Sequence, residues 1–296
     1  MRITSNSIAA KSYTNLQASL ARSERLQEQL SSGKQLSGPA DAPGQAASAL
    51  QLRNSLKVSE QYVRNADDGL AWLGAADTAL QSVSTQLRRV RELAVRGAST
   101  GSNNALSNAA MATEVQQIRD GLLDTANTTY LGRPIFGGTV TGSLAFQDNS
   151  PLPVTYVGDA GTVQRRIGPN AQVRADVSGT AAFGTPPASV FDVLNTLVNN
   201  LLTNPTAVGT DIAAIDTRID AVLASLSDVG SRVNRTESLR QISSDQALAL
   251  QSSLSELEDI DLPGTIVALK LQETAYQAAL SATARVIQPS LLDWLR

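Results

Sequence analysis

The residues best suited to chemistry in this chain are carboxylates that gather before Pro263. They are Glu256, Glu258, Asp259 and Asp261. Such a group could bind calcium, but the glycine-spaced order of an EF-hand loop is missing. A solvated joint between two helices is therefore the better interpretation. Asp67 and Asp68 are a second candidate, but adjacent residues of a helix point in different directions and make a poor acid–base pair.

Nucleophilic catalysis has little support, because the 296 residues contain no histidine and no cysteine. Without histidine a Ser-His-Asp site is impossible, and without cysteine there are no disulfides or thiolate metal sites. A Ser–Lys pair would need a lysine on an expected helix or linker: Lys11, Lys34, Lys57 or Lys270. The segments Gly137-Gly138-Thr139 and Gly158-Asp159-Ala160-Gly161 lack the lysine of a phosphate-binding loop. We predict no enzyme activity, no catalytic residue, no cofactor and no metal.

One basic patch suggests nucleic acid as a partner. Its residues are Arg88, Arg89, Arg91 and Arg96. The net charge of −3 and the scarcity of aromatic residues (4 %) argue against that partner. A solvated face, or a contact with an acidic face of a neighbouring subunit, is the better interpretation. No run of 18 apolar residues is present, so no membrane insertion is predicted. The first six residues lack the apolar core of a signal peptide, so any export is expected to use another route.

The elements that carry these residues are mainly long helices. Amphipathic helices are predicted over 8–30 and 262–295, at the two ends of the chain, with others over roughly 44–96, 106–127 and 188–257. Residues 65–69 are expected to break or kink the second of these. Between the helices, residues 132–187 are rich in glycine and proline. They predict a hairpin of 154–157 with 162–167 and a third strand over 173–177.

The expected fold is mainly α. A long antiparallel helical, coiled-coil rod is formed by both chain ends, with a small β-rich insert in the middle. We divide the chain into three domains. A terminal coiled-coil polymerisation domain comprises 1–36 and 262–296. A helical rod domain comprises 37–131 and 188–261, and 132–187 is a β-rich outer insert.

Apolar stripes on the two end helices are the strongest candidate site. On the last helix Leu262, Ile266, Leu269, Tyr276, Leu280 and Ile287 follow a four-three spacing that Glu273 and Thr283 interrupt. On the first, Leu16, Leu20 and Leu30 share a seam with Tyr13, Ala9, Ser23 and Gln27. An apolar plug follows at Leu291, Leu292, Trp294 and Leu295. One helix alone buries only part of its stripe, so we expect these ends to be loose until another subunit or a chaperone covers them.

Several motifs resemble the bacterial flagellin family. Three segments resemble the amino-terminal signature of that family: Arg2-Ile3-Thr4, Leu30-Ser31-Ser32-Gly33-Lys34 and the loop through Asp41-Ala42-Pro43-Gly44. Asn65-Ala66-Asp67-Asp68-Gly69 and Asn234-Arg235-Thr236-Glu237 are similar to further family motifs. Residues 273–278 and 285–295 resemble the ending of those members that join the flagellar hook to the filament. The loop Asp41-Ala42-Pro43-Gly44 departs from the Asp-Asp pair usual in filament subunits.

That resemblance implies a function. The chain would leave the cell through the flagellar export channel and form a homo-oligomeric ring. On the hook side it would meet a hook-associated protein, and on the other side the flagellin-side axial proteins. An export chaperone would dock on the carboxy-terminal stripe. Two alternatives stay open. The chain could be the filament subunit itself, needed in far more copies, or a secreted adhesin, for which an isolated 132–187 fragment should bind tightly.

Overall fold

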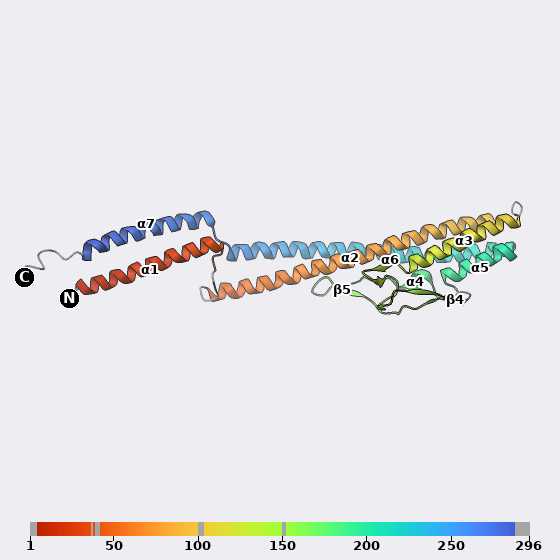
Figure 1. The fold of residues 1–296 in the computed structure, drawn as a ribbon, viewed down its shortest axis with the longest axis horizontal. Helices are drawn as coiled ribbons and strands as arrows, with labels where there is room; N and C mark the ends of the chain where they lie inside the picture. Colours follow the sequence, from red (N-terminus) through yellow and green to blue (C-terminus); the bar gives the residue numbers. More distant parts are fainter. Residues whose placement is uncertain (1–4, 37, 39–41, 100–103, 150–151, 288–296) are drawn as a thin grey trace, which may run out of the picture. The chain divides into compact units, whose positions relative to one another are not determined.

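The chain forms two compact units in a computed structural model that describes residues 5–36, 38, 42–99, 104–149 and 152–287. The terminal unit comprises 1–58 and 246–296, and the central unit comprises 59–245. Long helices dominate both units, and short strands occur in one stretch in the middle of the sequence (Figure 1). The predicted class, mainly α with a small β-rich insert, is confirmed.

Four helices contribute to the terminal unit: α1 (Ser5–Ser32), α7 (Leu262–Ile287), the start of α2 (Pro43–Ala98) and the end of α6 (Val208–Glu258). Gly33 ends α1 because it adopts a φ of +69°, which L side chains rarely tolerate. Its N–H donates to the carbonyl of Gln29 at 2.8 Å, closing the last turn. Pro43 begins α2, where its missing N–H would have had no helical partner.

Helix α2 runs without a break through residues 65–69, where the sequence predicted a break or a kink. Asparagine usually weakens a helix because its side chain competes for the local backbone. Here the Asn65 amide donates instead to the carbonyl of Arg166 at 2.7 Å. Asp67 pairs with Arg240, and Asp68 pairs with Arg165 at 2.5 Å. The polar side chains of this segment are thus used in tertiary contacts, and the helix continues.

The central unit adds three further α-helices, α3 (Ala105–Ala126), α4 (Gly179–Phe183) and α5 (Val190–Thr203), and a 3-10 turn, η1 (Pro205–Ala207). Asn104 caps α3 by accepting a hydrogen bond from the N–H of Ser107 at 2.8 Å. Ser189 and Asp192 form a reciprocal capping box at the start of α5. These caps place the helix starts close to the predicted positions.

In the middle of the chain, the described residues form six short strands in three antiparallel pairs. The pairs are β1 (Thr129–Tyr130) with β2 (Arg133–Pro134), β3 (Phe146–Asn149) with β4 (Leu152–Tyr156), and β5 (Gln164–Arg166) with β6 (Gln172–Arg174). The predicted hairpin of 154–157 with 162–167 is therefore wrong, because β4 and β5 each pair with a different strand.

Asp159 explains why the glycine-rich segment between β4 and β5 does not make a hairpin turn. Its carboxylate accepts hydrogen bonds from the Thr139 N–H at 2.7 Å, the Gly161 N–H at 3.0 Å and the Thr139 hydroxyl. The Tyr156 hydroxyl also donates toward the Asp159 and Phe136 carbonyls, at 2.9 and 3.0 Å. The segment is thus held against the 136–139 loop instead of folding back on β4.

We predict that Asp159→Ala loosens this loop without unfolding the helices. The hydrogen bond from the Thr139 hydroxyl, followed by that from its N–H, lowers the pKa of Asp159 below its ordinary 3.8. The stabilisation is therefore present above pH 3.8 and is lost as the pH falls through the lowered value. Hydrogen exchange at the Thr139 and Gly161 amides should be faster in the variant at pH 7. The exchange rates in Asp159→Asn should lie between those of the parent chain and of Asp159→Ala. Unchanged exchange in Asp159→Ala would contradict the role given to the Asp159 carboxylate.

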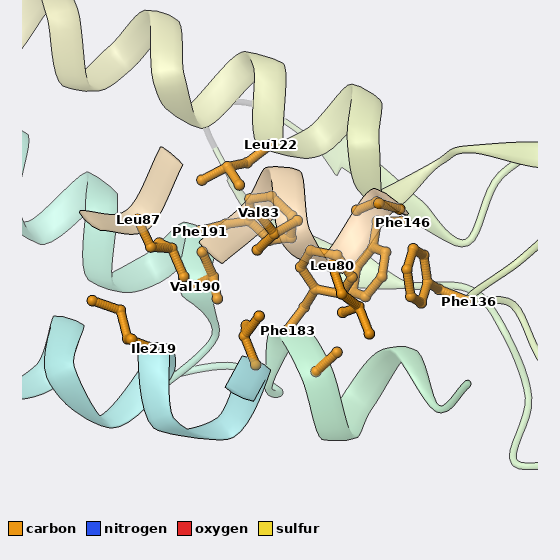
Figure 2. Packing of buried hydrophobic residues seen from close by; sticks show 14 of the residues in the cluster. Leu80, Val83, Leu87, Leu122, Phe136, Phe146, Phe183, Val190, Phe191 and Ile219 are labelled. Atoms are coloured by element: carbon orange, nitrogen blue, oxygen red, sulfur yellow. The ribbon is translucent and has the colours of Figure 1, made fainter. Parts of the chain in front are cut away.

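The hydrophobic core lies in the central unit. Figure 2 shows Leu80, Val83 and Leu87 of α2 packed with side chains of other helices, such as Leu122 of α3 and Ile219 of α6. Four phenylalanines join them: Phe136, Phe146, Phe183 and Phe191. The rings of Phe136 and Phe146 each lie 5.1 Å from that of Phe183, edge to face. The insert is thereby attached to the helices through aromatic packing.

Candidate assembly surface

Helices α1 and α7 lie side by side in the terminal unit and run antiparallel (Figure 1). The end of α1 lies beside the start of α7, because the Ile260 N–H donates to the Gly33 carbonyl at 3.2 Å and Lys34 bridges Asp259. Further along, the Gln272 amide donates to the carbonyl and to the hydroxyl of Ser19, at 3.0 and 2.7 Å.

The residues at this seam follow a four-three spacing on both helices, as expected for one helix packed along another. On α1 the less exposed positions are Ser12, Leu16, Ser19, Ser23, Leu26 and Leu30, with Gln29 beside them. On α7 they are Thr265, Leu269, Gln272, Tyr276, Ala279 and Thr283, with Glu273 beside them. More than half of them are polar, so the pair buries little apolar surface.

Large apolar side chains lie open on the outer sides of the same two helices. They are Tyr13 and Leu20 on α1, and Leu262, Ile266, Val267, Leu271 and Leu280 on α7. Their exposed fractions range from 42 % for Leu20 to 72 % for Leu271. Among the described residues of the terminal unit, Ala49 is the one buried apolar side chain, whereas the central unit has a large core. Several large exposed apolar side chains on one pair of helices are typical of an interaction site.

The structure separates the predicted site residues into three groups. Leu16, Leu30, Leu269 and Tyr276 are half-buried at the seam. Leu20, Leu262, Ile266 and Leu280 are exposed. Ile287 is the last residue of α7, and its side chain is not among those described. Leu291, Leu292, Trp294 and Leu295 lie outside the described residues.

Sequence reasoning missed Val267 and Leu271, which widen the exposed apolar side of α7. Their i, i+4 spacing next to the predicted stripe was a usable signal. It also missed the contact of Gln272 with Ser19, for which a stripe of apolar residues offers no signal.

The joint between α6 and α7 contains a buried charge. Glu258 is 3 % exposed, accepts a hydrogen bond from Arg53 at 2.8 Å, and lies 3.6 Å from the Lys34 ammonium. The predicted solvated joint is therefore wrong for Glu258. Its other carboxylate oxygen has no partner among the described atoms. Leu36, Ala46, Ala49 and Leu50 line an adjoining cavity of about 290 Å³. The ion pair of Glu258 with Arg53 thus occupies a place in the joint where apolar side chains would also fit.

Lys34 and Asp259 form the exposed half of this joint, at 2.5 Å. Their hydrogen bond is the largest cause that raises the pKa of Lys34 above 10.5 and lowers the pKa of Asp259 below 3.8. The carboxylate's contribution is present above pH 3.8 and is lost as the pH falls through its lowered pKa. The ammonium's contribution is present below pH 10.5 and is lost as the pH rises through its raised pKa. Both are therefore fully present at neutral pH.

We predict that Arg53→Leu destabilises the terminal unit by about 2–3 kcal/mol, because it leaves the Glu258 carboxylate buried with only the more distant Lys34. The double variant Arg53→Leu/Glu258→Leu should recover most of this loss, since two apolar side chains then meet the apolar wall. Urea unfolding followed by helix content measures both. A double variant no more stable than the single one would contradict this account.

Two arginines of the basic patch considered from the sequence are paired within the central unit. Arg89 contacts Glu114 at 2.8 Å and Glu92 at 3.2 Å, and Arg91 contacts Asp216 at 2.5 Å. Within the described ranges, no group of three or more histidine, cysteine, aspartate or glutamate side chains could hold a metal ion. The same ranges contain no helix long and apolar enough to cross a membrane.

Two family models match the chain and include its terminal helices. Residues 3–141 match the model of the bacterial flagellin N-terminal helical region, and residues 212–295 match that of the C-terminal helical region. Together the two matches span well over half of the chain and include both α1 and α7. The chain belongs to the bacterial flagellin family. The open apolar surface of α1 and α7 is therefore carried by the helical regions that define this family.

Among family members, the chain is similar to flagellar hook-associated protein 3 of Escherichia coli, with 28 % identity over 95 % of this chain and 96 % of the relative. It is 24 % identical to the flagellin of Bacillus subtilis over 88 % of each chain. The crystal structure of Bacillus cereus FlgL has a TM-score of 0.60 and 25 % identity, covering 69 % of this chain and 99 % of that one. The flagellar junction protein FlgL from Legionella pneumophila has the same fold, with a TM-score of 0.59, 16 % identity, and coverage of 73 % and 99 %.

Proposed function

We propose that this protein is a structural component of the bacterial flagellum that forms the junction between hook and filament. The observation that carries the proposal is the open apolar surface of α1 and α7, in a chain similar along almost its whole length to a hook-associated protein 3. A surface of this kind requires a partner made of similar helices, because an exposed apolar stripe is stabilised when another covers it.

The proposed assembly is a ring of identical subunits. Its contact residues would be Leu16, Leu20, Leu30, Leu262, Ile266, Leu269, Tyr276, Leu280 and Ile287, with the plug of Leu291, Leu292, Trp294 and Leu295. Within it, 1–36 with 262–296 would act as the polymerisation domain, 37–131 with 188–261 as the helical rod and 132–187 as the outer insert. The ring would contact a hook-associated protein on one side and flagellin-side axial proteins on the other.

Export is the second part of the proposal. The chain would leave the cell through the flagellar export channel and act outside the cell. An export chaperone would cover the apolar side of α7 before assembly, as a groove covers an amphipathic helix. The absence of cysteine suits this route, because no disulfide has to form or break on the way. No catalytic step belongs to the proposed function.

Electron microscopy of cells that lack the gene, with an assay of flagellin in their medium, tests the proposal. We expect hooks without filaments and free flagellin in the medium, because export continues while the filament has nothing to assemble on. Hooks without filaments and without a major secreted subunit would mean that this chain is the filament protein itself. Normal filaments would contradict both functions and favour the adhesin.

A further inference from the structure

Helix α7 turns its less apolar side toward α1. Of its seam residues between 265 and 283, only Leu269 and Tyr276 are large and apolar, whereas five large apolar residues of the same helix are at least 44 % exposed. A rotation of α7 about its own axis by about half of the roughly 100° between successive residues would keep Leu269 and Tyr276 at the seam. It would exchange Ala279 for Leu280 and Thr265 for Ile266. Burying more apolar surface would stabilise the isolated pair, so some feature must favour the arrangement observed.

The contact of Gln272 with Ser19 is that feature. Ser19 is 7 % exposed, and the Gln272 amide reaches both its hydroxyl, at 2.7 Å, and its backbone carbonyl, at 3.0 Å. In the rotated arrangement Glu273, which now lies half-buried at the edge of the seam and pairs with Lys270 at 2.9 Å, would take the place of Gln272. Its carboxylate cannot donate to the Ser19 carbonyl, and a charge would enter the seam. The bonds to Ser19 therefore exist in one rotation and one register.

We propose that Gln272 and Ser19 select the rotation of α7 on α1 and thereby keep the apolar side of α7 free for another copy of the chain. A single polar pair within a helical seam can fix register and partner at some cost in stability. The observed rotation places polar residues at the seam where Leu280 and Ile266 could lie, and these two apolar side chains stay exposed on α7. The role given to the second copy rests on the proposed function, whereas the choice of rotation does not.

Engineered cysteines can read the rotation directly, because the chain has none of its own. Ser12 and Ala279 are each seven residues from the selecting pair, on opposite sides, so they should face each other at the seam. Ser12→Cys/Ala279→Cys should cross-link readily in the full chain. Ser12→Cys/Leu280→Cys reports the rotated arrangement and should cross-link weakly, since Leu280 points outward.

Gln272→Leu tests the proposal in both cysteine backgrounds and in an assembly assay. We expect cross-linking to shift from the Ala279 pair to the Leu280 pair, greater protection of α1 and α7 from protease, and assembly about tenfold weaker, the factor that one or two buried hydrogen bonds contribute. Gln277→Leu makes the same change at an exposed position of α7 and should leave the cross-linking pattern as in the parent chain.

Cross-linking that stays at the Ala279 pair in Gln272→Leu would overturn the selection of rotation, whatever the assembly result. A shifted pattern with undiminished assembly would overturn its link to a second copy. Ser19→Ala provides an independent check, because it removes the hydroxyl and keeps a small side chain, and it should shift the pattern less than Gln272→Leu. If the parent chain does not assemble at all, the proposed function fails while the cross-linking result still decides the rotation.

Discussion

A chain with Ile266→Asp and Leu280→Asp should fold and fail to assemble. Both side chains are 44 % exposed on α7, so neither contributes to a core that folding requires. If a neighbouring subunit buries them, each loses about 2 kcal/mol of apolar contact and adds a carboxylate that must be desolvated. We therefore expect assembly to fall by more than about a hundredfold. Sedimentation of the polymerised protein measures this, and circular dichroism should show an unchanged central unit.

The matched control places the same two charges on the polar side of the same helix. Thr274 and Ser281 are exposed polar residues that lie roughly a quarter turn around the helix from Ile266 and Leu280, so Thr274→Asp/Ser281→Asp should assemble nearly as the parent does. If this control fails as completely as Ile266→Asp/Leu280→Asp, charge on α7 is harmful in general. Normal assembly of Ile266→Asp/Leu280→Asp would contradict the claim that a neighbouring subunit buries these two side chains.

Phe183→Ala should have the largest effect on folding, lowering the free energy of unfolding of the central unit by about 3–5 kcal/mol. Its side chain is fully buried and packs edge to face on Phe136 and Phe146, while its ring is stacked at 6.1 Å on Phe191. Removing it leaves a cavity that three other rings line. Chemical denaturation followed by near-ultraviolet circular dichroism measures the loss.

Phe183→Leu is the graded control, because it keeps much of the apolar volume and should lose clearly less stability than Phe183→Ala. The helices of the terminal unit should pair in both variants, since Phe183 belongs to the central unit. A loss below about 1 kcal/mol in Phe183→Ala would show that the four phenylalanines do not form a tightly packed core.

The helices could be predicted from the sequence because each has a long apolar period and a clear stop, such as Gly33 after α1. The break expected at residues 65–69 was wrong for a tertiary reason. Asn65, Asp67 and Asp68 look like turn residues, but they bond to Arg166, Arg240 and Arg165, which are distant in the sequence. Periodicity carries no information about such partners.

The predictions of the strand pairing and of a solvated joint between α6 and α7 were wrong for related reasons. Gly158-Asp159-Ala160-Gly161 is a good turn by composition, but the Asp159 carboxylate is satisfied by Thr139, twenty residues earlier. Glu258 looked solvated because three other acidic residues lie near it in the sequence, yet it is buried beside Arg53 from α2. Charge patterns identify what needs a partner, and only the fold decides which partner is near.

The apolar residues of the assembly surface could be predicted from the sequence. Which of them face the other helix and which face outward could not. A stripe of four-three spacing is compatible with either an intramolecular seam or an outward side. The structure divides it, with Leu269 and Tyr276 inward and Ile266 and Leu280 outward. Gln272 and Ser19 make that division through polar contacts, which hydrophobic periodicity does not register.

Gold-labelled antibodies against this protein, applied to intact flagella, test the central claim most directly. The account predicts a single narrow band of label where the curved hook meets the filament, on every flagellum and on hooks that have lost their filaments. Label along the whole filament would contradict it and identify the chain as a filament subunit. Label on the cell body alone would remove the protein from the flagellum altogether.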